Sequence, residues 1–302
     1  MPWPGGSSTV RVRWVGLAVW ALAMPLAGHE RAGAIWSAGE IPDHALPVID
    51  GDLREWALLG FEGVLTEDDF VDLVHGRAPS PADLGIRLQI GWSRSTNSLY
   101  LGASVYDDVH QVDRPFGAAS TRIFQDDALE VFVDADHSGG QYADFAGLEP
   151  DEALRITGTQ ANHFVLAGPH PDGVHFVNYS AAAWYALPDG PYTEAVVRYD
   201  AAARVTRYEL RLVPFDRIDV YAAFQSDEHQ LQAGQVLGFN VEVDDFDVWS
   251  ELYDAKWSLS GAQGSYRSAD RFGDLILLPF EGIFPASIES LSWGRVKAAV
   301  PR

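Results

Sequence analysis

The sequence predicts an all-β protein, a single antiparallel β-sandwich of the jelly-roll or immunoglobulin-like kind with long surface loops. From residue 86 onward, short apolar or alternating segments follow one another, separated by clusters of Gly, Pro, Asn and Asp. No stretch keeps a helical period for three or four turns. The composition does not change between the two halves of the 302-residue chain, so one domain is expected.

The first 34 residues have the organisation of a signal peptide. Arg11 and Arg13 form a positive region, residues 14–26 are apolar, and Ala32-Gly33-Ala34 fits an A-x-A cleavage site. The apolar run is about 13 residues long, shorter than the roughly 20 that a membrane-spanning helix needs. We therefore expect an exported protein, periplasmic or extracellular, without membrane insertion.

The folded domain is expected over residues 41–281, with a C-terminal tail at 282–302. After a turn at Asp50-Gly51, one short helical turn should bury Trp56, and residues 66–83 should form a surface loop because they are acidic and then rich in proline. The strands predicted after this loop are 86–92, 99–106, 129–133, 163–166, 174–179, 194–199, 207–212, 237–243, 256–259 and 275–278.

Alternation within residues 129–133 assigns a face to each side chain. Leu129, Val131 and Val133 should point to one side of the sheet, and Glu130 and Phe132 to the other, because the side-chain period of a strand is two. The first set suits a core. The second face is free to carry polar chemistry, although the simplest interpretation of Glu130 is a solvated strand position.

Charge and cysteine content restrict the possible partners. The formal net charge of −22 repels phosphate backbones and anionic membranes, so nucleic acid is excluded as a partner. The chain has no cysteine, which removes disulfides, thiolate metal sites and cysteine nucleophiles. Neutral sugars meet no electrostatic penalty, and a monomer is expected.

Acidic turns also favour a structural Ca²⁺ ion, since this cation prefers carboxylate and carbonyl oxygens. The segment DADHSGGQYAD is the best local candidate, because its glycines allow the chain to curl around an ion. The ligands it predicts are Asp134, Asp136 and Asp144. The alternative is that these acidic turns serve only solubility.

Two aromatic residues stand in loops that lead into apolar strands, Phe124 before residues 129–133 and Tyr266 before residues 275–278. A sugar ring has apolar C–H faces and a rim of hydroxyl groups, so a site for it needs aromatic planes beside polar groups. Phe124 and Tyr266, with Glu130 near the first, predict such a clamp. In a chain with many aromatic residues, both could equally be ordinary core or surface residues.

The order of several segments resembles the family 9 carbohydrate-binding modules and their relatives among the DOMON-like β-sandwiches. These segments are IDG followed by Trp56, then LYLGASVYDD, QDDALEVFVDAD, RYELRLVPF, LGFNVEVDDFD and FGDLILL. Together they cover residues 47–279.

The resemblance implies a site in which two tryptophans hold a sugar ring between them while a carboxylate, an arginine and an amide bind the hydroxyl groups. Phe124 and Tyr266 stand at the positions of the two tryptophans, so both keep a ring and neither keeps the indole. Glu130 corresponds to the carboxylate, Arg155 to the arginine and Gln263 to the amide.

The function expected is that of a non-catalytic, exported carbohydrate-binding protein that serves the breakdown of a polysaccharide or oligosaccharide. One alternative is a glycoside hydrolase that pairs Glu130 with a carboxylate among residues 244–247. Another is a haem-binding DOMON-like domain. Met1 and Met24 both lie in the leader, so the remaining chain offers no methionine as a haem ligand.

Overall fold

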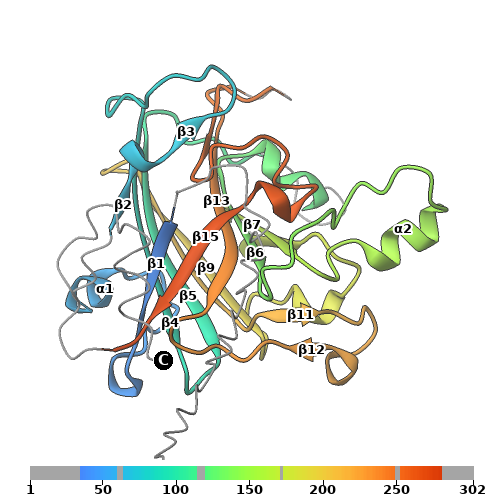
Figure 1. Cartoon of the computed structure of the whole chain (residues 1–302). Helices are drawn as coiled ribbons and strands as arrows, with labels where there is room; N and C mark the ends of the chain where they lie inside the picture. The colour runs from blue at the N-terminus through green and yellow to red at the C-terminus, as the bar shows by residue number, and fades with distance from the viewer. Residues whose placement is uncertain (1–34, 60–63, 114–119, 171–172, 249–251, 281–302) are drawn as a thin grey trace, which may run out of the picture.

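The computed structural model describes residues 35–59, 64–113, 120–170, 173–248 and 252–280 (Figure 1). The expected signal peptide at 1–34 and the tail at 282–302 lie outside the described residues. None of the described helices is long and apolar enough to cross a membrane.

One large sheet of 13 strands dominates the fold. The strands of its main path, in the order in which they lie side by side, are β8 (Gly173–Asn178), β7 (Asn162–His170), β6 (Ala128–Asp134), β13 (Val236–Asp245), β15 (Gly273–Leu278), β1 (Ile35–Glu40), β4 (Leu84–Ser93), β5 (Ser98–Asp107), β10 (Val205–Leu212) and β9 (Thr193–Asp200). The two ends of this path approach each other, because β9 contacts β7 and β8. The sheet therefore curls into a nearly closed, barrel-like sandwich.

Shorter elements attach to this sheet. β14 (Ala255–Ser258) pairs with β13 and with β3 (Val71–Asp72), β2 (Leu65–Thr66) pairs with β4, and β11 (Phe215–Arg217) and β12 (Asp227–Glu228) form a separate hairpin. The α-helices are α1 (Arg54–Leu58) and α2 (Pro150–Ile156). The 3-10 helices are η1 (Asp43–Ala45), η2 (Glu67–Asp69), η3 (Ser120–Gln125), η4 (Ala183–Tyr185), η5 (Ala223–Gln225) and η6 (Ala269–Arg271).

All ten predicted strands are present, but the expectation of a purely antiparallel sheet is wrong. β1 lies parallel to both of its neighbours, β15 and β4. This strand begins at Ile35, and its sequence IWSAGE has too little alternation to be recognised as a strand. Because β1 fills the space between β15 and β4, it joins strands from opposite parts of the chain into one continuous sheet.

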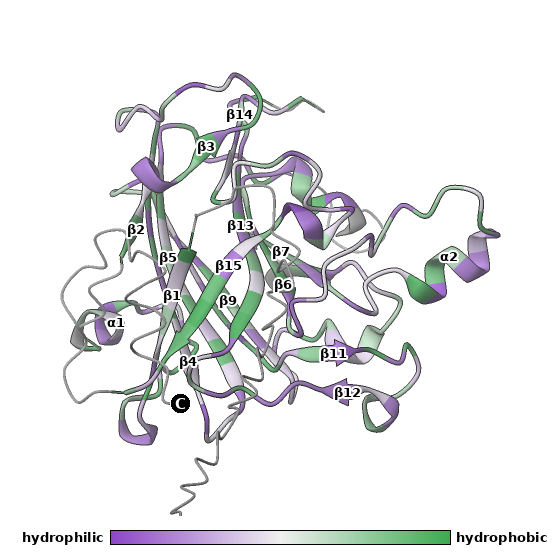
Figure 2. Cartoon of the chain, in the orientation of Figure 1, coloured by the Kyte–Doolittle hydropathy of each residue, from purple (hydrophilic) through white to green (hydrophobic). Residues whose placement is uncertain are grey.

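The core lies inside the curled sheet and contains the apolar residues of the alternating strands. Leu129, Val131 and Val133 belong to it, as predicted, together with Val241 and Val243 of β13. Figure 2 shows the apolar character of β15, which passes over the same core.

Loops cover part of the opposite face of β6 and β13. There Tyr142 and Phe272 pack on Phe132, which is fully buried. Glu130 on the same face is only 2% exposed, so the interpretation of it as a solvated residue is wrong.

The turn before α1 is attached to the sheet by a buried carboxylate. Trp56 is fully buried, as predicted, and its Nε1 donates to Glu209 of β10 over 2.7 Å. The backbone amides of Asp50 and Gly51 donate to the other carboxylate oxygen of Glu209. A side chain at position 102 would collide with the Trp56 indole, since a Cβ there would lie 2.6 Å from its Cε2 atom, so this contact requires Gly102.

We expect Glu209→Ala to lower the free energy of unfolding by ~1–3 kcal/mol, because buried donors lose their acceptor. Urea denaturation followed by tryptophan fluorescence would measure this. Glu194→Ala on the neighbouring strand β9 is the control, since the side chain of Glu194 is 44% exposed and its pair with Arg211 should contribute less than ~1 kcal/mol. Equal losses for the two variants would contradict the role assigned to Glu209.

Candidate functional site

A row of polar side chains crosses three adjacent strands on the face opposite the core. Asn240, Glu242 and Asp244 alternate along β13 and therefore point to the same side. Glu130 of β6 lies directly opposite Glu242, and Lys256 of β14 lies opposite Asp244. Sheet register alone thus gathers three carboxylates around one amine.

Lys256 stands at the centre of this group. Its Nζ lies 2.6 Å from an oxygen of Glu130, 2.6 Å from one of Asp244 and 3.1 Å from one of Glu242. Burial alone would lower the pKa of Lys256, but the three carboxylates outweigh this effect and hold the pKa well above its ordinary value. The ammonium is therefore the fixed countercharge of the site.

The carboxylates divide into different protonation states. Burial would raise the pKa of Glu130, but Lys256 and His163 together hold it below its ordinary value. For Asp244, burial and then the charge of Glu130 raise the pKa well above its ordinary value. The site therefore favours the charged form of Glu130 and the neutral form of Asp244.

His163 closes the group on the side of β7. Its Nε2 bonds to Glu130, and its ring stacks between Phe132 and Tyr179, with centroid separations of 4.2 and 4.8 Å. These stacked rings fix the imidazole and, through it, the carboxylate of Glu130.

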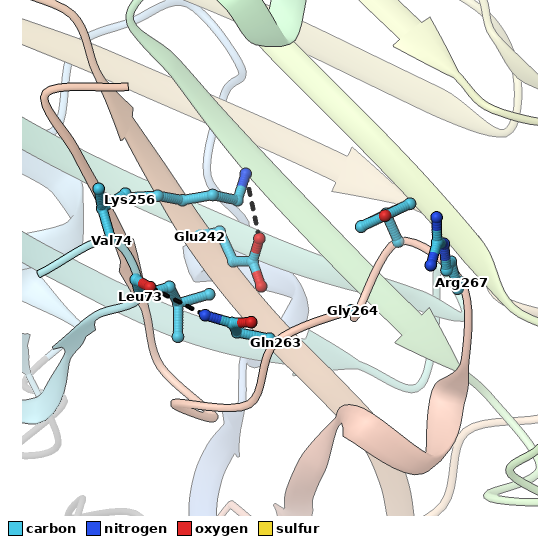
Figure 3. Close-up of a pocket in the computed structure, with 8 residues that line it drawn as sticks. Leu73, Val74, Glu242, Lys256, Gln263, Gly264 and Arg267 are labelled. Carbon is cyan, nitrogen blue, oxygen red and sulfur yellow. Dashed lines mark hydrogen bonds and ion pairs between the residues drawn. The ribbon is translucent and has the colours of Figure 1, made fainter. Parts of the chain in front are cut away.

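A pocket of about 430 Å³ opens above the Lys256 group (Figure 3). We call it the Tyr266 pocket; its lining residues are Leu73, Val74, Glu242, Lys256, Gln263, Gly264, Tyr266 and Arg267. Glu242 and Lys256 come from the sheet, whereas the others come from two loops. Tyr266 is 47% exposed, and the guanidinium of Arg267 lies 4.9 Å from the centre of its ring.

The loop that carries Gln263 and Tyr266 is fixed by the sheet below it. Asn240 donates from its Nδ2 to Ser265 Oγ over 3.0 Å and accepts from the backbone amide of Ser260 over 2.8 Å. Gln263 donates from its Nε2 to the backbone oxygen of Leu73 over 3.0 Å. These hydrogen bonds brace the pocket wall.

The structure brings together only part of the predicted sugar site. Tyr266 and Gln263 line the pocket, and Glu130 lies beneath it, one hydrogen bond behind Lys256. Phe124 is not among the lining residues. It lies half-buried in η3 against an apolar cluster, 6.3 Å from the ring of Tyr179. Arg155 lies on α2 and lines a different pocket.

Sequence reasoning missed Glu242 and Lys256, which supply the charges of the pocket. The signal was present in the alternation of Asn240, Glu242 and Asp244 along one strand and of Lys256 and the serines after it along the next. These residues lie on one face because β13 and β14 pair with each other. The pattern of a single strand does not reveal its pairing partner.

Carboxylates also gather at the C-terminal end of β13, where Asp245 directly follows Asp244. Oxygens of Asp107, Asp245 and Asp247 lie within 4.8 Å of one another. Burial raises the pKa of Asp107 to about 7, and burial followed by the charge of Asp107 raises that of Asp245 to about 8. In the part of the chain that the structure describes, no ion pair joins these residues to a basic side chain.

The predicted Ca²⁺ ligands do not form such a group among the described residues. Asp134 is buried and accepts from the amide of Gly139, Asp136 is exposed, and Asp144 forms an ion pair with Arg267 over 2.8 Å.

No family model matches the sequence, and no curated protein matches it. Among solved structures, the chain is similar to a family 9 carbohydrate-binding module from Caldicellulosiruptor kristjanssonii in complex with cellotriose. The TM-score is 0.53 and the identity 14%, with 84% of this chain and 99% of the module covered. The same kind of module from that organism in complex with glucose gives a TM-score of 0.52 at 14% identity, over 82% and 97% of the two chains. The likeness establishes the fold of a family 9 carbohydrate-binding module.

Replacing Lys256 tests the electrostatics of the site. We expect Lys256→Met to lower the free energy of unfolding by ~3–5 kcal/mol at pH 7, because buried carboxylates lose their countercharge. Glu130 has a lowered pKa, so its stabilising contribution is complete above its ordinary pKa and is lost as the pH falls. The difference between variant and wild type should therefore shrink from pH 7 to pH 3. Urea denaturation across this range would measure it, and a difference independent of pH would refute the assignment.

Proposed function

We propose that this protein binds a neutral saccharide in the Tyr266 pocket and does not act on it as an enzyme. The observation that carries the proposal is the half-exposed ring of Tyr266 beside a floor of fixed polar groups. A sugar offers an apolar face to such a ring and hydroxyl groups to such a floor. The two modules that share the fold bind cellotriose and glucose, which are neutral sugars.

Each lining residue has a part in this proposal. Tyr266 stacks on the face of the sugar. The amide oxygen of Gln263 accepts a hydrogen bond from a sugar hydroxyl, while Nε2 of Gln263 keeps its hydrogen bond to the backbone oxygen of Leu73. Glu242 accepts hydrogen bonds from sugar hydroxyl groups, and Lys256 donates hydrogen bonds to hydroxyl oxygens. Glu130 does not touch the sugar but orients Lys256 from behind. One aromatic face thus replaces the predicted clamp of two, since Phe124 lies outside the pocket.

The carboxylate geometry favours binding over hydrolysis. A glycosidase needs two carboxyl groups roughly 5–9.5 Å apart across the scissile bond. Among the described residues that line the pocket, Glu242 is the one acid. Glu130 and Asp244 are buried beneath it and both bond to Lys256. The described lining residues of this pocket also include no histidine that could serve as an axial ligand of haem.

We expect Tyr266→Ala to weaken saccharide binding about tenfold, since stacking on an aromatic ring contributes roughly 1–3 kcal/mol. Isothermal titration with neutral oligosaccharides, cellotriose first, would measure the affinity. Tyr266→Trp should preserve binding, because it keeps a stacking surface, and Phe124→Ala should leave the affinity within about twofold. Unchanged affinity in Tyr266→Ala would exclude this pocket.

We also propose export, with a role beside a separate enzyme in the breakdown of a polysaccharide. The basic, apolar and A-x-A regions of residues 1–34 support it. The intact mass of the protein, expressed in a bacterial host with a general export pathway, should correspond to a chain that begins at Ile35. A full-length mass in the exported fraction would contradict the assigned cleavage site.

A structural Ca²⁺ ion is proposed at Asp107, Asp245 and Asp247, in place of the turn predicted from sequence. Asp107 and Asp245 are almost fully buried, and Oδ1 of Asp247 is a buried oxygen without a hydrogen-bond partner among the described residues. Convergent buried carboxylates that lack a basic partner fit a hard divalent cation.

Calcium should raise the melting temperature, and EGTA should reverse the effect. At 100 times the dissociation constant the gain is ~2.7 kcal/mol, which corresponds to about 5–10 °C for a domain of this size. Asp245→Asn should abolish the response in differential scanning fluorimetry. Asp144→Asn, which lies outside this group and pairs with Arg267, should retain the response. A response lost in Asp144→Asn but kept in Asp245→Asn would return the site to the predicted turn.

A further inference from the structure

A second pocket, of about 410 Å³, lies between α2 and the loop that follows β11. We call it the Tyr221 pocket; its lining residues are Glu152, Arg155, Ile156, Thr159, Arg217, Ile218, Asp219, Val220 and Tyr221. It shares no lining residue with the Tyr266 pocket. Figure 2 shows α2 and the β11–β12 hairpin on one side of the molecule, away from β14 and β3.

An exposed but braced aromatic residue forms one wall of this pocket. Tyr221 is 78% exposed. The carboxylate of Asp219 accepts from the backbone amides of Tyr221 and Ala222 over 2.9 and 3.1 Å, and the amide of Asp219 donates to Ser226 Oγ over 2.8 Å. The amide of Ile218 also donates to the backbone oxygen of Thr159 over 2.7 Å. These bonds hold the backbone under Tyr221 in place without covering its ring.

Arg155 supplies the opposite wall with hydrogen-bond donors. Its Nε donates weakly to the backbone oxygen of Asp151 over 3.3 Å, and no ion pair engages Arg155 in the described part of the chain. Arg155 is exposed and lines the pocket, so its other N–H groups can donate to a ligand there. Arg217, in contrast, is tied to Asp227 over 2.8 Å and to the backbone of Gln225.

The charges that line the pocket balance. Glu152 and Asp219 provide carboxylates against the guanidinium groups of Arg155 and Arg217. An anionic ligand would meet both carboxylates and the acidic surface of the whole chain. A neutral ligand with hydroxyl groups can accept from Arg155 and donate to Glu152 at the same time.

We propose that the Tyr221 pocket is a second binding site for a neutral saccharide, with Tyr221 as the stacking platform and Arg155 as the principal donor. A planar ring beside a planar fork of donors matches the face and the rim of a sugar ring. The pocket volume lies in the range of small-molecule sites. Two saccharide sites on one domain would bind separate segments of one polymer, so that its overall affinity exceeds that of either site.

Isothermal titration of neutral trisaccharides (cellotriose, xylotriose and mannotriose) into the full chain tests the proposal. The variants are Tyr221→Ala, Tyr266→Ala and their combination, and Phe224→Ala is the control. Phe224 is 88% exposed on the same loop but does not line the pocket. We expect wild type and Phe224→Ala to bind two sugars per chain. Tyr266→Ala should keep one site, which the added Tyr221→Ala weakens about tenfold or more.

The outcomes separate this inference from the function proposed for the Tyr266 pocket. One sugar per wild-type chain, lost in Tyr266→Ala and unaffected by Tyr221→Ala, would refute the second site and leave the first standing. Binding that is lost in Tyr221→Ala but kept in Tyr266→Ala would refute the Tyr266 pocket as a saccharide site and leave the Tyr221 pocket standing. If none of the three sugars binds wild type, both assignments fall. Arg155→Ala should reproduce Tyr221→Ala, which guards against a folding defect in the tyrosine variant; circular dichroism would check each fold.

Discussion

The ammonium of Lys256, held among Glu130, Glu242 and Asp244, is the interaction on which the site depends. Each partner lies on a different strand or a different register position, so the charges meet only when β6, β13 and β14 are correctly paired. Removal of Lys256 would leave buried carboxylates without their countercharge, so the whole arrangement depends on this one ammonium. The pocket floor is consequently rigid, and a ligand that binds there spends little free energy on ordering it.

The ten strands after residue 83 could be predicted because each is marked by its own apolar or alternating sequence. The runs around Leu129 and Val241 alternate or are continuously apolar, and the turn residues between such runs mark their ends. β1 was not predicted because its sequence, IWSAGE, has neither clear alternation nor a continuous apolar run, and only Ala38 and Gly39 are buried in it. Its partners, β15 and β4, are distant in the chain, so the sequence around β1 does not indicate which strands it pairs with.

The site was less accessible for a related reason. Glu130 and Tyr266 were predicted from the strand and loop that carry them, and Gln263 from the family resemblance. The structure places all three in or directly beneath one pocket. Phe124 was predicted on the same grounds as Tyr266, and Arg155 from the resemblance alone. The half-buried position of Phe124 in η3 and the position of Arg155 on α2 place both outside this pocket. Lys256 and Glu242 depend on cross-strand register, a property of pairs of segments that a reading of one segment at a time cannot supply.

The parallel pairing of β1 also affects how the molecule is built. β15 is the last strand of the sheet to be synthesised, and β1 the first, so the closing contact joins the two most distant strands of the described chain. Contacts of such long separation form slowly, because a large loop must be ordered before they yield any gain. β15 pairs with β1 on one side and β13 on the other. Until β15 has been synthesised, the strand edges of β1 and β13 that pair with it remain unpaired. A nascent chain in that state needs protection from aggregation.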